Sequence, residues 1–290
     1  MHEPSEPILH LALPKGRMQT NVVRLLADAS LHLRESARSY RPTLSAPGYE
    51  VKLQKPQSIL EMLHAGTRDL GFAGADWVAE LGVDVVELLD TGLDPVRIVV
   101  AAPKELVRDG ALSRRPLTIA SEYERLTQAF LARRDCGDRF VRSYGATEVF
   151  PPEDADAILD NSATGTTLQA NGLVVVEEIV KSSTRLYASR RAMADAAKVA
   201  RIDGLVLLLR SVLDARLRVM LEVNVAPSNL AAIVAVLPCM REPTVSPLHG
   251  GAGYAVKAAV PRAALASLIP ALRARGGADV VVTELIHLAT

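Results

Sequence analysis

Strand-like and helix-like segments alternate through most of this chain, and this alternation limits the possible folds more than any other feature. Short apolar runs bounded by Gly, Pro or polar residues indicate buried strands, and the amphipathic run at 21–31 indicates a helix. The strand-like runs are ILHLAL (8–13), DLGFAG (69–74), VRIVVAA (96–102), LTIAS (117–121), DAILD (156–160) and TRLYAS (184–189). Such alternation is typical of α/β folds with largely parallel strands, and residues 190–217 are then predicted to be mainly helical.

The pattern changes at residue 219. The expected order is now strand, helix, strand, strand, helix and strand, in about 70 residues, which is the ferredoxin-like β-α-β-β-α-β plan. The segments are VMLEVNV, PSNLAAIVAVL, PTVSPL, YAVKAAV, PRAALASLIPALRARG and DVVVTELIH. We therefore place a domain boundary near residues 211–218.

Length and charge limit the classes of function. The chain has 290 residues, enough for two or three compact units. Its 33 basic and 33 acidic residues balance, so no overall field attracts nucleic acid or an acidic membrane surface. An anion site must therefore be local.

The chain start and the cysteines carry no targeting or metal-binding pattern. Glu3 and Glu6 stand where a signal peptide needs positive charge, and the longest apolar runs are too short to span a bilayer. Cys136 and Cys239 are far apart and lie in no metal-ligand spacing. We expect a cytoplasmic protein with reduced thiols.

The stretch ADAILDNSATGTTLQANG (155–172) carries the strongest chemical pattern. It places Asp160 at the end of a predicted strand, and small residues then run from Ala163 to Thr167 around Gly165. Thr164, Gly165, Thr166 and Thr167 offer backbone N–H groups and hydroxyls without bulk, which suits a phosphate, and the carboxylate suits two sugar hydroxyls. A phosphorylated ribose fits both halves, while a polar turn with a Thr cap is the structural alternative.

The stretch LPKGR (13–17) directly follows the first predicted strand. Lys15 and Arg17 would lie at the carboxyl end of that strand, where open α/β sheets bind ligands, and Gly16 lets a phosphate approach the backbone. Two cations there suit a polyanion, although basic loop residues are also commonly just solvated.

Three further stretches supply candidate walls of the same cleft. DLGFAGADW (69–77) contributes Gly74 and Asp76, YGATEVFPP (144–152) contributes Glu148, and SEYERLT (121–127) contributes Ser121. Each has a structural alternative, namely strand-to-helix packing for the first, a surface position for Glu148 and a helix cap for Ser121.

In this order the stretches ALPKGR, DLGFAGADW, ASEYERLT and GATEVFPPEDADAILDNSATGTTLQANGL resemble the ATP phosphoribosyltransferase family over essentially the whole chain. The tail, with LEVNV, LPCMREPTVSPL and GGADVVVTELI, is similar to that of the long form with its own regulatory domain. The resemblance implies a two-lobed catalytic part of the periplasmic-binding-protein type (type II). Lobe I would comprise 1–103 plus 184–210, lobe II 104–183, and the regulatory domain 219–290.

The resemblance also implies the reaction, in which ATP and phosphoribosyl pyrophosphate give phosphoribosyl-ATP and pyrophosphate in the first step of histidine biosynthesis. Asp160 would bind the ribose hydroxyls and Ala163 to Thr167 the 5-phosphate. Lys15 and Arg17, with Mg²⁺ held largely by the pyrophosphate, would take up the leaving charge, and Glu148 would line the ribose site. Other phosphoribosyltransferases commonly have two adjacent acids here, whereas this chain has Asp160 followed by Asn161.

For the tail, the resemblance implies feedback inhibition by histidine and a homohexamer. Asn224 and Thr244 are the polar residues that we predict near the effector, because both lie on predicted strands of one small sheet. Thr244 could equally be an ordinary β-branched strand residue.

Two other classes of function remain open at this point. One is a two-lobed small-molecule-binding protein without catalysis, since such folds host many non-enzymes. The other is a phosphoribosyltransferase that acts on a free base, which would leave the LPKGR stretch and the tail unexplained.

Overall fold

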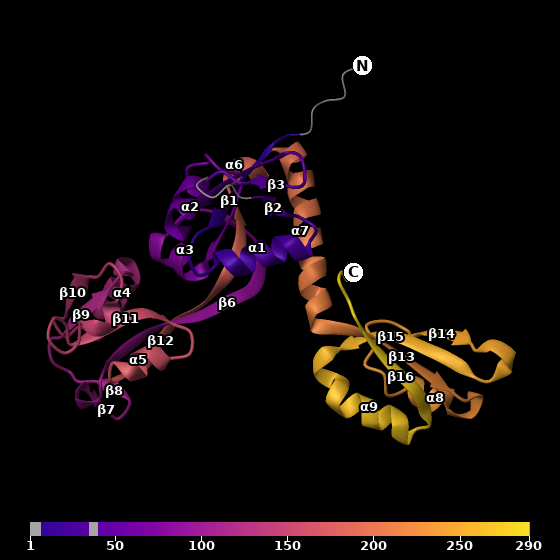
Figure 1. Ribbon diagram of the computed structural model, residues 1–290. Coiled ribbons are helices and arrows are strands. Elements are labelled where there is room, and N and C mark those ends of the chain that lie inside the picture. Colours follow the sequence, from indigo (N-terminus) through magenta and orange to yellow (C-terminus); the bar gives the residue numbers. More distant parts are fainter. Residues whose placement is uncertain (1–6, 35–39, 290) are drawn as a thin grey trace, which may run out of the picture. The chain divides into compact units, whose positions relative to one another are not determined.

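A computed structural model of the chain describes residues 7–34 and 40–289. The chain divides into two compact units, one made of residues up to 27 together with 31–202, and the other of residues 28–30 together with 203 onward. The sequence pattern puts a boundary at 211–218, whereas this division falls inside the helix α7 (Ala196–Leu217), which runs unbroken through it. Figure 1 shows the helices and strands of both units.

An eight-stranded sheet forms the centre of the first unit, in the order β10-β9-β11-β6-β12-β5-β1-β4. Its strands are β1 (Leu9–Pro14), β4 (Tyr49–Gln54), β5 (Leu70–Gly74), β6 (Val86–Pro103), β9 (Thr118–Ser121), β10 (Arg139–Arg142), β11 (Ala157–Ser162) and β12 (Leu173–Ala188). Two small hairpins accompany it, β2 (Leu33–Arg34) with β3 (Thr43–Leu44), and β7 (Val107–Arg108) with β8 (Ala111–Leu112).

The expectation of largely parallel strands holds only for the outer parts of this sheet. β1 runs parallel to β4 and β5, and β9 runs parallel to β10 and β11. The two long strands β6 and β12 are antiparallel to each other and to their neighbours β11 and β5. A buried apolar run has the same composition whether its strand is parallel or antiparallel to its neighbours. The sequence pattern therefore could not predict the antiparallel direction of β6 and β12.

β6 and β12 lie in the middle of the sheet, between the group β9, β10 and β11 and the group β1, β4 and β5. Both strands extend from one of these groups to the other (Figure 1). β6 spans 18 residues and β12 spans 16, so each is far longer than the apolar runs that predicted them. The register between them shifts at several points. Charged residues interrupt the extra length, and much of it is partly or fully exposed.

Helices cover the sheet and connect its strands. They are α1 (Gln19–Asp28), α2 (Pro56–His64), α3 (Ala75–Leu81), α4 (Glu124–Arg134), α5 (Thr166–Ala170), α6 (Arg190–Met193) and α7, with the 3₁₀ turns η1 (Lys104–Leu106) and η2 (Thr147–Val149). α2 begins at Pro56 because proline suits the first turn and the extended Lys55 precedes it. The Ser189 hydroxyl caps α6 by accepting from the Ala192 N–H at 3.1 Å.

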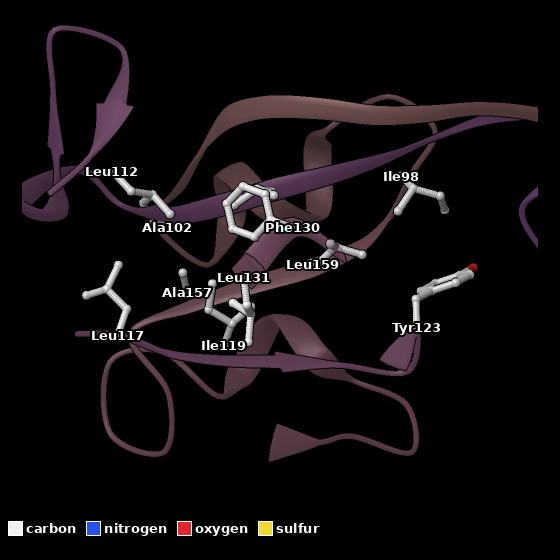
Figure 2. Close-up of a cluster of buried hydrophobic side chains, with 11 residues drawn as sticks. Ile98, Ala102, Leu112, Leu117, Ile119, Tyr123, Phe130, Leu131, Ala157 and Leu159 are labelled. Atoms are coloured by element: carbon white, nitrogen blue, oxygen red, sulfur yellow. The ribbon is translucent and has the colours of Figure 1, made fainter. Parts of the chain in front are cut away.

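Strand alternation sends the apolar residues of β6, β9 and β11 into separate clusters on the two faces of the sheet. Figure 2 shows most of one cluster, with Tyr123 at its end and the Tyr123 oxygen directed away from the other side chains. The buried members of this cluster are Ile98, Val100, Ala102, Leu112, Leu117, Ile119, Tyr123, Phe130, Leu131, Ala157 and Leu159. Val99, Ala101 and Ile158, from the same strands, belong to a second cluster. This two-sided core fixes the end of β11 and the turn before α4.

The second unit carries a four-stranded antiparallel sheet in the order β14-β15-β13-β16. Its strands are β13 (Arg218–Val225), β14 (Thr244–Pro247), β15 (Tyr254–Pro261) and β16 (Gly277–Glu284), joined through α8 (Leu230–Val234), α9 (Leu265–Ala274) and the turns η3 (Pro227–Asn229), η4 (His249–Gly251) and η5 (Arg262–Ala264). The β-α-β-β-α-β order and this strand order together make the ferredoxin-like fold. Among the residues described, no helix combines the length and apolar character needed to cross a membrane.

Candidate active site

Asp160 lies near the end of β11, with its carboxylate held from several sides. The Asn161 backbone N–H donates to Asp160 Oδ1 at 2.7 Å, and the Asn161 side-chain nitrogen donates to the same oxygen at 3.1 Å. Thr147, from η2, also hydrogen-bonds the Asp160 side chain. Thr147 is in turn 2.8 Å from the Ser143 hydroxyl, between Thr147 Oγ1 and Ser143 Oγ. One oxygen of Asp160 is thus fixed by local donors.

Burial raises the pKa of Asp160 to about 6. The nearby carboxylates of Glu122 and Glu148 raise it further, while the hydrogen bonds from Asn161 and Thr147 oppose the rise. A carboxylate with such a pKa is ionised at neutral pH but has lost much of its water, so it favours a ligand that brings hydroxyl donors or positive charge.

The loop after β11 turns sharply at Gly165, whose φ of +82° is the left-handed conformation that glycine adopts without strain. A Cβ placed at Gly165 would meet no atom within 4 Å, so this side of the backbone faces open space. The Thr164 and Thr166 hydroxyls lie 2.9 Å apart. Small side chains therefore leave backbone and hydroxyl groups open to a ligand.

This loop and Asp160 line one cavity of about 370 Å³, called here the loop cavity. Its wall also includes Glu148 and Arg17, so residues from four separate stretches of sequence meet there. The lining residues are Arg17, Glu122, Gly145 to Glu148, and Asp160 to Leu168. The structure thus brings together Asp160, the Ala163 to Thr167 loop, Glu148 and Arg17.

A second cavity of about 340 Å³, called here the aromatic cavity, lies beside it. Arg17, Glu122 and Asn161 line both cavities. The remaining lining residues are Lys15, Met18, Pro56, Gln57, Asp76, Trp77 and Tyr123. The Lys15 ammonium lies 3.3 Å from the centre of the Tyr40 ring, which is a cation–π contact.

Asp76, at the start of α3, organises the wall of the aromatic cavity. The Tyr123 hydroxyl donates to Asp76 Oδ2 at 2.7 Å, and the Ser182 hydroxyl donates to Asp76 Oδ1 at 2.6 Å. Trp77 stacks on Tyr123, with ring centres 4.7 Å apart. Burial, together with the Asp76 charge, holds the pKa of Tyr123 far above its usual range, so the phenol stays protonated and donates.

Three residues that the sequence predicted for the site line neither the loop cavity nor the aromatic cavity. Gly74 lines neither cavity, but a Cβ there would lie 2.2 Å from Asp76 Oδ1, so its lack of a side chain makes room for that carboxylate. Ser121 is fully buried, donates to the Leu159 carbonyl at 2.5 Å and accepts from the Tyr123 N–H at 2.8 Å. Gly16 lines a separate cavity with Gln19, Thr20, Val23 and Leu33.

Several cavity residues were not predicted from the sequence. These residues, Tyr123, Glu122, Trp77 and Thr147, lie inside stretches quoted from the sequence, but their side chains formed no distinct pattern there. Gln57 lies outside the stretches singled out in the sequence, and it lines the aromatic cavity.

No cluster of three His, Cys, Asp or Glu side chains suited to a metal ion occurs in the described ranges. Asp160, Glu122 and Glu148 line one cavity without converging on a point. This arrangement fits a hydrated ion that arrives with phosphate ligands, because Mg²⁺ keeps several waters and needs few protein oxygens.

In the second unit, Thr244 lines a cavity of about 520 Å³, called here the tail cavity. Charged neighbours in this cavity are Arg241, Glu242 and Lys257, and Lys257 pairs with Glu222. Asn224 lies on β13 outside the cavity, where its amide donates to Asp279 Oδ2 at 3.1 Å. Of the two predicted effector residues, only Thr244 faces this space.

Comparisons with known proteins agree with this architecture. Residues 55–211 match the family described as ATP phosphoribosyltransferase, and residues 215–287 match the C-terminal domain of that family. The ATP phosphoribosyltransferase of Pelotomaculum thermopropionicum is 36% identical over 278 residues, covering 94% of this chain and 96% of the relative. That of Chlorobium luteolum is 35% identical over 280 residues, covering 95% of each.

A solved structure, the ATP phosphoribosyl transferase (HisG:HisZ) complex from Thermotoga maritima, is similar in fold, with a TM-score of 0.63 at 22% identity. The similarity covers 71% of this chain and 99% of that one. Fold, length and sequence identity agree: the chain belongs to the ATP phosphoribosyltransferase family, in the form with a C-terminal domain.

Proposed function

We propose that this chain transfers the phosphoribosyl group of phosphoribosyl pyrophosphate to ring nitrogen 1 of ATP and releases pyrophosphate. The observation that carries the proposal is the loop cavity, in which one partly desolvated carboxylate faces a small-residue loop. Membership of the ATP phosphoribosyltransferase family supports the same reaction. Phosphoribosyl-ATP formation is the first step of histidine biosynthesis, and it takes place in the cytoplasm.

In this proposal the loop cavity holds the phosphoribosyl group. Asp160 accepts hydrogen bonds from the ribose hydroxyls through the oxygen that Asn161 leaves free. The backbone N–H groups and hydroxyls of the Ala163 to Thr167 loop bind the 5-phosphate, for which the open side of Gly165 provides the space. Glu148 lines the ribose end of the cavity.

Arg17 and Lys15 bind the leaving pyrophosphate. Arg17 lines both cavities, so it lies where the anomeric carbon and its leaving group would meet the second substrate. Guanidinium and ammonium groups suit a polyanion because they donate several charge-assisted hydrogen bonds.

ATP binds in the aromatic cavity, with its adenine near Trp77 and Tyr123 and with Asp76 and Gln57 on the walls. An apolar ring face and a few polar groups are the usual components of a small-molecule site. Asn161 and Glu122, which line both cavities, then lie near the point of bond formation.

The chemistry needs charge stabilisation more than proton transfer. The anomeric C–O bond breaks, its electron pair leaves with pyrophosphate, and the lone pair of adenine nitrogen 1 forms the new C–N bond. Positive charge develops on the ribose, where the Asp160 carboxylate stabilises it, and negative charge develops beside Arg17 and Lys15. Nitrogen 1 carries no proton, so no general base is required for attack.

A divalent ion, Mg²⁺ in this proposal, supplies further neutralisation of the pyrophosphate charge when it is bound. Substrate oxygens and water would provide most of its ligands, because the cavity carboxylates do not converge on one point. Asp160, Glu122 and Glu148 line the same cavity and would hold such an ion through its water ligands.

The tail cavity is the proposed site of feedback inhibition by histidine. Arg241 and Lys257 suit the carboxylate of an amino acid, Glu242 its ammonium group and Thr244 a polar atom of the ring. Asn224 contributes through the sheet rather than by contact. We assign lobe I to 1–103 plus 184–210, lobe II to 104–183 and the regulatory domain to 219–290, and a homohexamer as the working assembly.

The direct test is chromatographic detection of phosphoribosyl-ATP when the purified protein is incubated with ATP, phosphoribosyl pyrophosphate and Mg²⁺. Calorimetric titration with each ligand separates the alternatives. Binding of both substrates without product would indicate a binding protein. Consumption of phosphoribosyl pyrophosphate only with a free base would indicate a different phosphoribosyltransferase.

A further inference from the structure

The last residues that the structure describes, 285–289, follow β16 and have no regular secondary structure. This segment is called here the strap. Ile286, in its middle, is 74% exposed, so burial of this side chain contributes little to holding the strap in place. Leu288 and Ala289 line the tail cavity. The strap is therefore one wall of the proposed effector site.

Two hydrogen bonds anchor the strap on Ser211, in the second half of α7. The Leu288 N–H donates to the Ser211 carbonyl at 2.9 Å. Ser211 Oγ lies 2.8 Å from His287 Nδ1, while the Ser211 hydroxyl donates its one proton to the Leu208 carbonyl at 2.7 Å. His287 Nδ1 is therefore the donor to Ser211 Oγ. Ser211 is only 4% exposed, so water competes poorly for its side of these bonds.

A third contact ties the chain just before the strap to the end of α7. Glu284, the last residue of β16, pairs with Arg262, whose Nη1 donates to Glu284 Oε1 at 2.7 Å. Arg262 Nε also donates to the Arg216 carbonyl at 3.2 Å. The chain is thus connected to α7 both before and after Ile286.

We infer that the strap transmits occupancy of the tail cavity to α7, because this short segment both lines the cavity and is anchored on Ser211. The inference deepens the proposed function, on which the identity of the effector rests. Leu288 joins the two contacts directly, since it lines the cavity and its N–H is bound to α7. A ligand that displaces Leu288 must break this hydrogen bond or move the turn of α7 that accepts it.

α7 can carry such a change out of the second unit, because the helix runs unbroken across the division of the chain. His287 and Ser211 are positioning residues in this account. Neither lines the tail cavity, and both act through the placement of Leu288. If the strap transmits the state of the effector site, breaking its anchor separates histidine binding from inhibition.

The test compares His287→Phe and Ser211→Ala with the unsubstituted full chain. Phenylalanine keeps an aromatic ring and removes the donor, and alanine removes the acceptor hydroxyl. We expect unchanged turnover without histidine, and a calorimetric Kd for histidine that rises by less than about 3-fold. The factor by which saturating histidine lowers turnover should shrink by about 5-fold or more. Inhibition of unchanged strength would overturn the inference. Loss of histidine binding would overturn it too, because the anchor would then only form the site.

Two matched controls make the same substitutions elsewhere in the second unit. His249→Phe changes an exposed histidine that does not line the tail cavity. Ser267→Ala removes a hydroxyl that, like that of Ser211, donates to the carbonyl three residues earlier, at 3.1 Å. Both should be inhibited normally. The double variant of His287→Phe and Ser211→Ala should lose no more inhibition than the more affected single variant, because both changes remove one bond. A further loss would contradict a shared anchor.

A second measurement needs neither histidine nor substrates, and it separates this inference from the proposed function. Ala259→Leu partly fills the tail cavity from β15. Hydrogen exchange measured by mass spectrometry then reports local opening of α7 over residues 205–217. We expect Ala259→Leu to change this exchange by about 3-fold or more, and His287→Phe to abolish the change.

No change in α7, or an equal change with and without His287→Phe, would contradict transmission through the strap. If the exchange behaves as expected but histidine does not bind the unsubstituted protein, the assigned effector is wrong and the role of the strap stands.

Discussion

The Tyr123 hydroxyl donates to the Asp76 carboxylate at 2.7 Å, although the two residues are 47 positions apart. This bond joins the start of α3 to the turn before α4. A second contact reinforces it, since the two carboxylate oxygens of Glu80 accept the backbone N–H groups of Arg125 and Leu126, each at 3.0 Å. One side of α3 therefore holds the first turn of α4 in place, and with it the Tyr123 wall of the aromatic cavity.

Gly74→Ala tests this connection. The backbone of Gly74 is ordinary for alanine, with φ of −77°, but the new Cβ would lie 2.2 Å from Asp76 Oδ1. The carboxylate must move and its hydrogen bonds to Tyr123 and Ser182 weaken, which should cost about 1–3 kcal/mol of unfolding free energy. Denaturant unfolding measures the change. Gly204→Ala is the control, because that helical position has open space and should be neutral or slightly stabilising.

Asp160→Asn should abolish most activity and keep the fold. The amide matches the carboxylate in size, but it lacks the charge that stabilises the electron-poor ribose. We expect kcat to fall by about 100-fold or more, while ATP binding is little changed. Steady-state kinetics and calorimetry on the purified variant check both parts. Turnover close to that of the unsubstituted enzyme would remove Asp160 from its assigned role.

The same substitution should stabilise the protein above pH 6. Burial raises the Asp160 pKa from its ordinary 3.8 to about 6, so the folded state disfavours the charged carboxylate and loses stability as pH rises between those values. At about pH 8 this loss is complete and amounts to up to about 3 kcal/mol, which Asp160→Asn removes. Thermal unfolding should give a higher Tm for the variant at about pH 8, and the difference should vanish near pH 4.

Gly165→Val should weaken binding of phosphoribosyl pyrophosphate far more than binding of ATP. The branched side chain would enter the open side of the loop, and the φ of +82° adds backbone strain. Gly172→Val separates these effects: its φ is +70°, it also faces open space, and it lines neither cavity. Calorimetric titration of both ligands into both variants decides. A loss of equal size for the two ligands in Gly165→Val would make the loop a structural turn only.

The sequence predicted the parts of this molecule that depend on local pattern. Short apolar runs located β1, β5, β9 and β11, and the tail pattern predicted a ferredoxin-like sheet. Direction was not encoded in these runs, so the antiparallel orientation of β6 and β12 was not predicted. Charged residues interrupt the rest of both strands, and their full length was not predicted either.

At the candidate site, residue type and spacing singled out some of the residues that line the loop cavity. Residues whose position depends on contacts with distant parts of the chain were not predicted. Asp160 and the loop to Thr167 could be predicted because carboxylate, glycine and hydroxyls are adjacent in sequence. Tyr123 takes its position from Asp76, which lies in a distant stretch, so nothing local revealed it. Gly74 was predicted as a wall of the cleft, but it lines neither cavity, and its lack of a side chain makes room for Asp76.

Thr244→Val should reduce inhibition by histidine while leaving uninhibited turnover unchanged. Thr244 lies on the edge strand β14, opposite Lys257 in the register of β15, and both line the tail cavity. Valine keeps the β-branched shape and removes only the hydroxyl, so the sheet is retained while a hydrogen bond to the effector is lost. We expect the inhibitory concentration of histidine to rise by about 5- to 10-fold, the value of one hydrogen bond. Ser246→Ala, two residues along the same strand and outside the cavity, is the control and should leave inhibition unchanged. Equal inhibition of both variants and the unsubstituted enzyme would move the effector site away from the tail cavity.

A stronger version replaces Lys257 with Met, which removes a cation assigned to the histidine carboxylate and should raise the inhibitory concentration further. If that change also left inhibition intact, histidine would have to bind outside the tail cavity, and the assignment of regulation to this surface of the C-terminal sheet would be wrong.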